Sequence, residues 1–410
     1  MCKVSEVKNV PEICFAGFTD AWEQRKLGDL GTITTGNTPS TSISDYYSDD
    51  GIMWVTPTDI NENITFESAR KLSELGQQVA RVVSKNTILV TCIASIGKNT
   101  MLGNIGSFNQ QINGLTPNEK KYDPYFLLTE SALWSAQMKK SAAAGTMQIV
   151  NRTEFFELKT WLPNLNEQRK IGLFFRCLDN LITLHQQKYD RLVALKKAML
   201  EKMFPQNGSN VPEVRFAGFT GPWKQRKLGD LVQFSKGTGY SKADLTEDGI
   251  PIILYGRLYT KYETVISDVD TFAIAKSGSV YSRGGEVIVP ASGETAEDIS
   301  IASVVEKSGV LLGGDLNIIT PSADLDSAFL AISISNGKPH DDMAKMAQGK
   351  SVVHLHNTDL KQIDLTYPSH EEQTQISGFF RGIDHLIALQ QCRHESLKRV
   401  KAALLQKMFV

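Results

Sequence analysis

An internal duplication constrains this chain more than any other feature. Residues 10–30 read VPEICFAGFTDAWEQRKLGDL, and residues 211–231 read VPEVRFAGFTGPWKQRKLGDL. Sixteen of these 21 positions are identical at an offset of 201 residues. A second match joins residues 163–204 to residues 368–409, with 19 of 42 positions identical at an offset of 205. Because these offsets of 201 and 205 residues are far longer than a solenoid repeat of about 20–50 residues, the sequence predicts two copies of a whole domain, each with its own trailing segment.

The segments between these landmarks differ strongly from each other. They share only short traces, such as Thr35-Gly36 with Lys236-Gly237. Within them, apolar runs between turn residues predict strands at residues 52–57, 87–94, 250–255 and 286–289, and longer patterns predict helices at residues 123–140 and 324–336. Each copy is therefore predicted to be an α+β domain.

The two trailing segments carry helix signals. Asn164 and Ser369 each stand three residues before a glutamate, as in a capping box. Apolar residues then recur at alternating spacings of three and four, which predicts a heptad seam along each helix. The seam residues are Ile171, Phe174, Leu178, Leu181, Leu192, Leu195 and Met199 in the first copy, and Ile376, Phe379, Ile383, Leu386, Leu397, Val400 and Leu404 in the second.

Two packings of these helices are compatible with the seam. Each helix packs on its own domain, or the two helices pair with each other. We favour pairing, because a helix of about 40 residues with an apolar stripe needs a partner along its length. The duplication then implies a pseudo-twofold axis and an antiparallel coiled coil. The expected organisation is a first α+β domain at residues 1–162, a first spacer helix at 163–210, a second α+β domain at 211–367 and a second spacer helix at 368–410.

Composition narrows the functional class. The formal net charge is −1, so nucleic-acid binding would have to depend on local basic surface. The five cysteines, Cys2, Cys14, Cys92, Cys177 and Cys392, form no Cys-x-x-Cys pair, which favours reduced thiols in the cytoplasm over a disulfide framework or structural zinc. No apolar run is long enough for a membrane span, and no membrane partner is expected.

The sequence lacks the common catalytic motifs. Gly97-Lys98-Asn99-Thr100 is no phosphate loop, because the first glycine of that motif would fall at Cys92. Lys236–Tyr240 has two glycines but not the third that a dinucleotide loop requires. His354 and His356 share one strand face without a third metal ligand nearby. The chain is therefore expected to have no catalytic residues and no metal site.

Taken together, these features resemble the specificity subunits of type I restriction–modification systems over nearly the whole chain. The most specific parts are the repeated FxGFxxxWxxxxLGDL frame at residues 15–30 and 216–231 and the helix starts at Pro163 and Pro368. Ser95–Lys98, Asn109–Gly114, Lys236–Lys242 and Ile252–Gly256 also look like patterns of that family.

The resemblance implies a function without catalysis by this chain. Each variable segment would be a target-recognition domain reading one half of an asymmetric bipartite site in double-stranded DNA, with the gap set by the coiled coil. Two methyltransferase subunits would dock on the shared framework, bind S-adenosylmethionine and methylate adenine, while restriction subunits add translocation driven by ATP and Mg²⁺, and cleavage. This chain would hold no cofactor.

Two other classes remain open at this point. One is a standalone DNA-binding regulator built on a coiled coil, although the near-neutral charge disfavours it. The other is a methyltransferase or nuclease with motifs that have not been recognised.

Candidate DNA-contacting residues are polar or charged side chains in the predicted turns, because such groups read base edges. Shared frame residues such as Arg25-Lys26 and Arg226-Lys227 cannot encode two different half-sites and suit phosphate contact or subunit docking. The candidates are Thr35, Asn37, Ser40, Thr56, Thr58, Lys98, Gln110 and Gln148 in the first domain, and Lys236, Tyr240, Lys242, Tyr255, Arg257, Tyr259, Ser292, Glu294 and Lys350 in the second.

Overall fold

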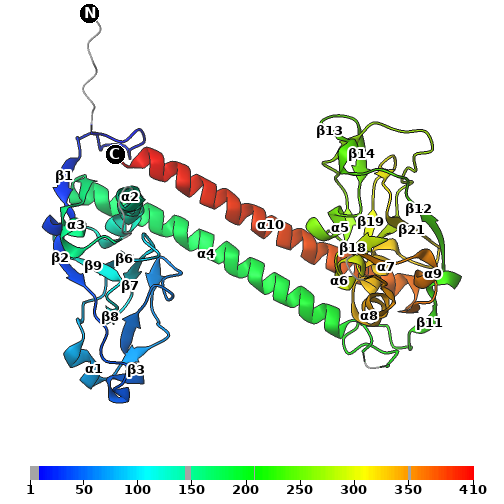
Figure 1. Cartoon of the computed structure of the whole chain (residues 1–410), viewed down its shortest axis with the longest axis horizontal. Helices are drawn as coiled ribbons and strands as arrows, with labels where there is room; N and C mark the ends of the chain where they lie inside the picture. The colour runs from blue at the N-terminus through cyan, green and yellow to red at the C-terminus, as the bar shows by residue number, and fades with distance from the viewer. Residues whose placement is uncertain (1–8, 144–148, 207, 350–351) are drawn as a thin grey trace, which may run out of the picture. The chain divides into compact units, whose positions relative to one another are not determined.

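The computed structural model describes residues 9–143, 149–206, 208–349 and 352–410. The chain divides into two compact units (Figure 1). The first unit contains residues 1–186 and 392–410, and the second contains residues 187–391. Each unit combines helices with several small sheets, which confirms the predicted α+β class.

A five-stranded sheet forms the centre of the first unit, in the order β2-β9-β6-β7-β4. A three-stranded sheet, β5-β3-β8, and the antiparallel pair β1-β10 accompany it. The strands are β1 (Glu23–Lys26), β2 (Gly31–Thr35), β3 (Tyr47–Val55), β4 (Ile64–Thr65), β5 (Lys71–Leu72), β6 (Ile88–Thr91), β7 (Asn99–Leu102), β8 (Gly106–Phe108), β9 (Ile112–Pro117) and β10 (Lys159–Leu162). The helices are α1 (Glu74–Val79), α2 (Pro124–Ala143) and α3 (Arg152–Glu157), with short 3-10 turns η1 (Leu27–Asp29) and η2 (Ser44–Tyr46).

The second unit has a central five-stranded sheet in the order β12-β21-β17-β19-β15. Beside it are the four strands β13-β16-β14-β20 and the pairs β11-β23 and β18-β22. The strands are β11 (Lys224–Lys227), β12 (Val232–Lys236), β13 (Leu245–Thr246), β14 (Ile250–Ile253), β15 (Val265–Ile266), β16 (Phe272–Ala273), β17 (Glu286–Pro290), β18 (Ser292–Gly293), β19 (Ser303–Val305), β20 (Leu311–Leu312), β21 (Leu316–Pro321), β22 (Val353–His354) and β23 (Asp364–Tyr367). The helices are α5 (Arg257–Thr260), α6 (Ala296–Ile299), α7 (Ser327–Ile334), α8 (Gly337–Met346) and α9 (Asn357–Leu360), with 3-10 turns η3 (Leu228–Asp230) and η4 (Lys242–Asp244).

The two central sheets have the same topology although their sequences diverge. In each sheet the first four strands are joined by antiparallel pairings, and the last strand adds in parallel, as β4 on β7 or β15 on β19. Asn113 pairs with Thr35 and Val90, and Asn317 occupies the equivalent place between Lys236 and Val289. The inserts are therefore diverged copies of one domain, a relation that the traces of sequence similarity only suggested.

The two long helices are α4 (Leu165–Lys202) and α10 (His370–Met408), and each passes through both units. In the first unit the beginning of α4 lies against the end of α10, where Lys401 Nζ is 2.6 Å from Asp179 Oδ1. In the second unit the roles reverse, and Lys196 Nζ is 2.5 Å from Asp384 Oδ1. These two ion pairs join equivalent positions of the repeat, so the helices run antiparallel within each unit, as predicted.

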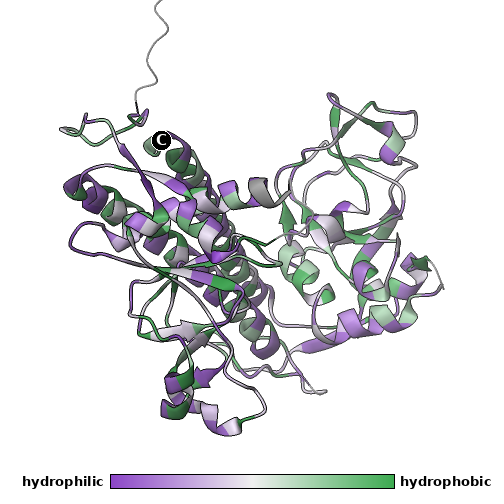
Figure 2. Ribbon diagram, turned by 60° about the vertical axis from the view of Figure 1, so that its left-hand side comes forward, coloured by the Kyte–Doolittle hydropathy of each residue, from purple (hydrophilic) through white to green (hydrophobic). Residues whose placement is uncertain are grey.

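The seam differs in detail from the predicted heptads. Ile171 and Leu178 are buried, but Leu181 and Leu195 are 46% and 43% exposed. Phe175 is fully buried and Ile182 packs against the same core, so the buried stripe of α4 steps forward by one residue at these places. An α-helix of 3.6 residues per turn drifts away from a strict heptad pattern, and in each unit the helix packs on a globular domain as well as on the other helix. Hydrophobic residues still recur along both helices among hydrophilic ones (Figure 2).

The C-terminal end of each long helix completes the core of a domain. Met408 and Phe409 lie in the first unit, where the centre of the Phe409 ring is 5.4 Å from that of Phe126 and 5.8 Å from that of Trp22. In the second unit Phe204 lies 5.8 Å from both Trp223 and Phe329. The phenylalanine of the repeated Lys-Met-Phe sequence at each helix end thus packs into the hydrophobic core of one domain.

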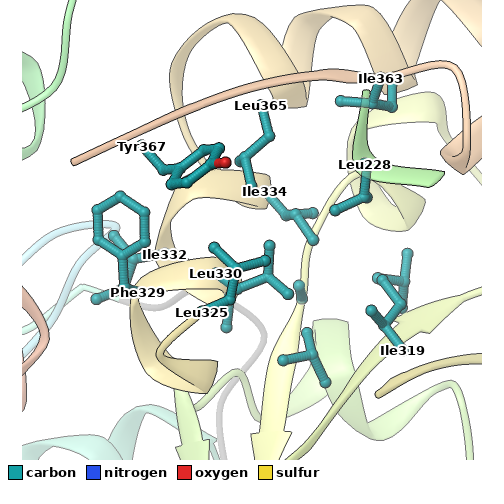
Figure 3. Close-up of a cluster of buried hydrophobic side chains, with 14 of the residues drawn as sticks. Leu228, Ile319, Leu325, Phe329, Leu330, Ile332, Ile334, Ile363, Leu365 and Tyr367 are labelled. Atoms are coloured by element: carbon teal, nitrogen blue, oxygen red, sulfur yellow. The ribbon is translucent and has the colours of Figure 1, made fainter. Parts of the chain in front are cut away.

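The core of the second unit extends from these rings over α7 and the neighbouring strands. Figure 3 shows Phe329, Leu330, Ile332 and Ile334 of α7 gathered with side chains of the strands around them. All of them are nearly or fully buried. Because α7 is apolar on every side, it can only be stable in such an enclosed position.

Replacing Phe409 by Ala is expected to destabilise the first unit by about 3–5 kcal/mol, since the ring is 6% exposed and the site is already enclosed. Val410→Ala is the matched control, because Val410 is the next residue and is 40% exposed. Chemical unfolding followed by tryptophan fluorescence measures both variants. Equal midpoints for the two variants would contradict the role of Phe409 in this core.

Glu130 of α2 is a buried carboxyl whose Oε1 accepts hydrogen bonds from Thr160 Oγ1 and from Trp161 N, the latter at 3.2 Å. Its Oε2 has no hydrogen-bond partner among the described residues. Burial raises the pKa of Glu130 from 4.5 to about 8, and the two hydrogen bonds offset only part of this. The folded state therefore binds this proton more tightly than the unfolded state does.

The resulting stability is present below pH 4.5 and is lost as the pH rises towards 8. Glu130→Gln keeps the acceptor and removes the titration. We expect the variant to match the wild type near pH 5 and to exceed its free energy of unfolding by a few kcal/mol, as an order of magnitude, above pH 8. Glu62→Gln makes the same charge change at an exposed position and should show no such pH dependence. The prediction would be contradicted if the difference in free energy of unfolding between Glu130→Gln and the wild type were the same at both pH values.

Candidate nucleic-acid interface

Four loops of the first unit meet at one end of its sheets. They are residues 36–43, 56–61, 92–98 and 109–111, which we call the first rim. Thr38 Oγ1 donates to Gln110 Oε1, and Lys98 Nζ donates to the Pro57 carbonyl at 3.0 Å, so each bond joins two of these loops. The backbone bond from Asn109 N to Val55 O, 3.0 Å long, ties the fourth loop to the end of β3.

Two residues at this rim that were predicted to contact DNA form hydrogen bonds within the domain instead. Thr35 Oγ1 donates to Asn113 Oδ1 at 2.6 Å. Asn37 donates to the Val79 carbonyl at 2.9 Å and accepts from Arg81 N at 2.8 Å. Because both side chains are committed inside the domain, their contribution is to position the loop that follows them.

Other candidates of the first rim are presented to solvent. Ser40, Thr58, Lys98 and Gln110 are exposed, and Thr56 is half-buried with its hydroxyl on Asp59 at 2.6 Å. These groups offer hydroxyl, amide and ammonium hydrogen-bonding atoms of the kind that contact bases and phosphates. Gln148 lies outside the described residues.

Thr38 and Arg81 lie at the first rim but were not among the predicted DNA-contacting residues. Thr38 is exposed at the rim, and Arg81 NH1 donates to the Thr35 carbonyl at 2.7 Å. Arg81 follows α1, more than forty residues from the loop that it supports. The sequence contains no local signal that links it to that loop.

The second rim is formed by residues 236–242, 254–259, 292–298 and 354–357 of the second unit. Asn357 Nδ2 donates to the Ser235 carbonyl at 3.1 Å, and Ser292 pairs with His354 across β18 and β22. Lys236, Lys242 and Glu294 are exposed here. The Tyr255 and Tyr259 rings are half-buried and 6.1 Å apart, edge to face.

Burial is the main cause that raises the pKa of Tyr259, with Tyr255, Glu294 and Asp298 adding to it. The Tyr259 hydroxyl therefore stays neutral and can donate a hydrogen bond. The two tyrosines offer aromatic surface beside an acidic group, unlike the first rim.

Arg257 was a favoured candidate for base contact, but the fold directs it inward. Its guanidinium donates to Glu263 Oε2 and Asp270 Oδ1 at 2.7 Å each, and its side chain is only 8% exposed. A third bond reaches the Asp268 carbonyl at 2.9 Å. In this structure Arg257 fixes α5 and the strand that follows, which in turn positions Tyr255 and Tyr259.

Tyr240 and Ser292 are also buried. The Tyr240 hydroxyl lies 2.5 Å from Ser279 Oγ and accepts from Lys276 N at 2.8 Å, while the Lys276 ammonium lies over its ring. Ser292 is 5% exposed within β18. Lys350 lies outside the described residues.

His354 and His356 stand exposed with their rings stacked, 6.3 Å apart and 5° from parallel. The described residues contain no group of three His, Cys, Asp or Glu side chains that could hold a metal ion. In the first unit, burial raises the pKa of Cys92 to about 11, so this thiol is protonated and a weak nucleophile at neutral pH. The exposed groups of both rims can bind a ligand through hydrogen bonds, charge and stacking.

A comparison with protein families decides what these two units are. The model of the type I restriction modification DNA specificity domain matches residues 19–194 and again residues 221–399. The chain belongs to this family. It is a specificity subunit with two specificity domains, one in each copy of the duplication.

Individual relatives agree with this assignment. The MjaVIII specificity subunit of Methanocaldococcus jannaschii is 21% identical over 94% of this chain and 91% of its own length. The HindI specificity subunit of Haemophilus influenzae is 26% identical over 44% of this chain and 40% of its own length. Both are named as subunits of type I restriction enzymes.

Solved structures share the fold. The type I restriction–modification S subunit from M. genitalium superposes with a TM-score of 0.65 at 14% identity, covering 98% of this chain and 99% of that one. A chain from a study of type I complex assembly and conformational transition gives 0.51 at 17% identity over 96% and 98%. Among the described residues of this specificity subunit, no helix combines the length and hydrophobicity that a membrane crossing requires.

Gly36 and Gly237 explain one trace of similarity between the two inserts. A Cβ on Gly237 would lie 1.9 Å from the Gly313 carbonyl oxygen, and one on Gly36 would lie 2.1 Å from that of Asn109. Each domain thus needs a glycine where β2 or β12 ends against a neighbouring loop, because no side chain fits.

Gly237→Ala is expected to displace the loop before Tyr240 and to weaken recognition by the second domain alone. Gly239→Ala is the control, since a Cβ there meets nothing within 4 Å. Affinity for specific DNA, measured with the assembled complex, should fall about tenfold or more for Gly237→Ala, as expected when a base-reading loop shifts and loses about 1–3 kcal/mol. The rim assignment would be wrong if both variants bound alike.

Proposed function

We propose that this specificity subunit reads an asymmetric bipartite site in double-stranded DNA, with one half-site for each α+β domain. The observation that carries this proposal is the pair of equally folded domains whose rims present different side chains. A common scaffold places the loops alike, and only the residues on the loops differ. Two such readers suit two different DNA sequences.

The chemistry of each rim supports this difference. Thr58, Lys98 and Gln110 give the first rim hydroxyl, ammonium and amide groups. The second rim offers Lys236, Glu294 and the Tyr255–Tyr259 pair instead. Lysine suits guanine or phosphate, glutamine suits adenine, and glutamate suits the amino group of cytosine.

The helices α4 and α10 serve as the spacer in this proposal. Both run without interruption through the two units, and the ion pairs Lys401–Asp179 and Lys196–Asp384 hold their antiparallel register. The number of helical turns then sets the length of the unread gap between the half-sites.

Catalysis is assigned to partner subunits. Two DNA methyltransferase subunits would dock on the duplicated frame, binding S-adenosylmethionine and methylating adenine, and restriction–translocase subunits would use ATP and Mg²⁺. The chain itself would bind no cofactor, contribute no catalytic group and work in the cytoplasm, where its DNA substrate lies. The shared frame favours two like partners, because equivalent surfaces occur twice in the chain.

Family membership supports this reading over a standalone DNA-binding regulator. The net charge of −1 also favours a subunit that binds DNA tightly only within a complex. The test is to map methylated adenines by long-read sequencing in cells expressing the partner subunits with and without this chain. One asymmetric bipartite motif should appear only when the chain is present. Sequence-specific methylation by the isolated chain, or an unchanged methylation pattern without it, would overturn the proposal.

Lengthening both helices tests the spacer. Seven residues inserted after Gln186 and after Gln391, where the two units divide, keep the helix faces in register and add about 10.5 Å, or roughly three base pairs. The methylated motif should keep both half-sites and gain a longer gap. An insertion of the same composition after Ser209, outside both long helices, is the control and should leave the gap unchanged. An altered half-site with the original gap would contradict the spacer role.

A further inference from the structure

The duplicated frame encloses a pocket in each unit. Both pockets lie between the segment before β1 or β11 and the start of α4 or α10, and their volumes are about 330 and 370 Å³. The first frame pocket is lined by Asp20, Ala21, Glu23, Arg25, Lys121, Tyr122, Leu162, Pro163, Asn164, Leu165, Glu167 and Gln168. The second frame pocket is lined by Arg215, Gly218, Phe219, Thr220, Gly221, Pro222, Trp223, Lys224, Tyr367, Pro368, Ser369 and Glu372.

An arginine of the chain itself occupies the second frame pocket. Arg215 Nε and NH2 donate to the two carboxylate oxygens of Glu372 at 2.8 and 2.7 Å, and NH1 donates to the Gly221 carbonyl at 2.6 Å. The side chains of Arg215 and Glu372 are only 12% and 2% exposed. Such a two-pronged bond between guanidinium and carboxylate is among the strongest and most specific polar contacts in proteins.

The first frame pocket has the same carboxylate without the arginine. Glu167 stands where the second copy has Glu372, and it is 2% exposed. The residue equivalent to Arg215 is Cys14, and no cation among the described residues forms an ion pair with Glu167. The Arg25 guanidinium lines the pocket but pairs with Glu23 at 2.6 Å, and Lys121 lines it without an ion pair to any described residue.

Two further differences between the copies make the surroundings of Glu167 more acidic than those of Glu372. Gly221 and Lys224 of the second pocket are replaced by Asp20 and Glu23 in the first. Around Glu167 the first copy therefore has two additional carboxylates, and one of them stands in place of a cation. Asp20 stands where the second copy places the Gly221 carbonyl that accepts from the guanidinium.

A buried carboxylate is costly to keep without a cationic partner. Burial raises the pKa of Glu167, and the charge on Asp20 raises it further, while the Trp22 indole partly offsets both effects. The first frame pocket thus contains a buried carboxylate whose counterpart in the second copy binds a guanidinium.

We propose that the first frame pocket binds, through Glu167, the guanidinium of an arginine side chain presented by another protein, whereas in the second pocket Arg215 already pairs with the equivalent Glu372. The two halves of the frame are then unequal docking surfaces, because Glu372 is paired with an arginine of the chain and Glu167 is not. The assignment of this arginine to a methyltransferase subunit rests on the proposed function. The binding of a guanidinium by the pocket does not depend on it.

The direct probe is Nα-acetyl-arginine methylamide, with the uncharged citrulline analogue as its control. Saturation-transfer NMR on the full chain should show saturable binding of the arginine probe alone. Cys14→Arg, which supplies the missing side chain, and Glu167→Gln, which removes the charge, should each abolish this binding. Arg215→Cys should leave Glu372 without its guanidinium partner and add a second binding site for the arginine probe. Equal binding by wild type, Cys14→Arg and Glu167→Gln would overturn the proposal.

A variant without residues 1–8, which lacks Lys3 and Lys8, tests whether the chain itself supplies the cation. Unchanged probe binding by this variant supports an external arginine. Stronger binding would show that the chain fills its own pocket and would overturn the proposal.

The assembled complex tests the source of the arginine. Native mass spectrometry with the methyltransferase subunits should show that Cys14→Arg, but not Cys14→Ser, weakens the binding of one of two copies. If the wild type binds the probe but the Cys14→Arg variant still binds both methyltransferase subunits normally, the pocket binds arginine and its assignment to a methyltransferase subunit is wrong. If no bipartite methylation depends on the chain, the proposed function fails while probe binding is still measured independently.

Discussion

The structure depends on the exchange of helix ends between the two copies. Phe409 ends the second long helix yet fills the core of the first unit between Trp22 and Phe126. Phe204 ends the first long helix and fills the core of the second unit beside Trp223 and Phe329. Neither α+β domain has a complete core without the helix that arrives from the other side of the repeat. The antiparallel pairing of the helices is therefore coupled to the folding of both domains.

This coupling explains why the chain keeps some parts alike and lets others diverge. The frame before β1 and β11, the helix starts and the Lys-Met-Phe ends all contribute to the same core twice. The loops of the two rims carry no such packing duty, so they tolerate different side chains. Even so, the sheet order is the same in both inserts, because apolar strands with compatible turns can build one topology from very different residues.

The candidate site shows where sequence reasoning stops. Exposed residues such as Lys98, Gln110 and Lys236 could be chosen from their chemistry and their position in turns. Arg257 was chosen for the same reasons, yet three acceptors within its own domain hold it. A sequence cannot show whether a long polar side chain points outward or back to a carboxylate, because residues 263 to 270 take their place only after folding. Arg81 was missed because the Thr35 carbonyl to which it donates lies 46 residues away in the chain and comes near it only after folding.

The sequence by itself determined the duplication, the α+β class, the two long helices and the family. These follow from identity at fixed offsets and from short-range periodicity, which are properties of neighbouring residues. Only the tertiary structure decided that the inserts share one sheet order and that α4 buries Phe175 where the seam predicted Phe174. It also decided that Glu167 is left without the arginine that Glu372 has. Each of these depends on contacts between segments far apart in the chain, and the burial that gives such contacts their energy exists only in the folded molecule.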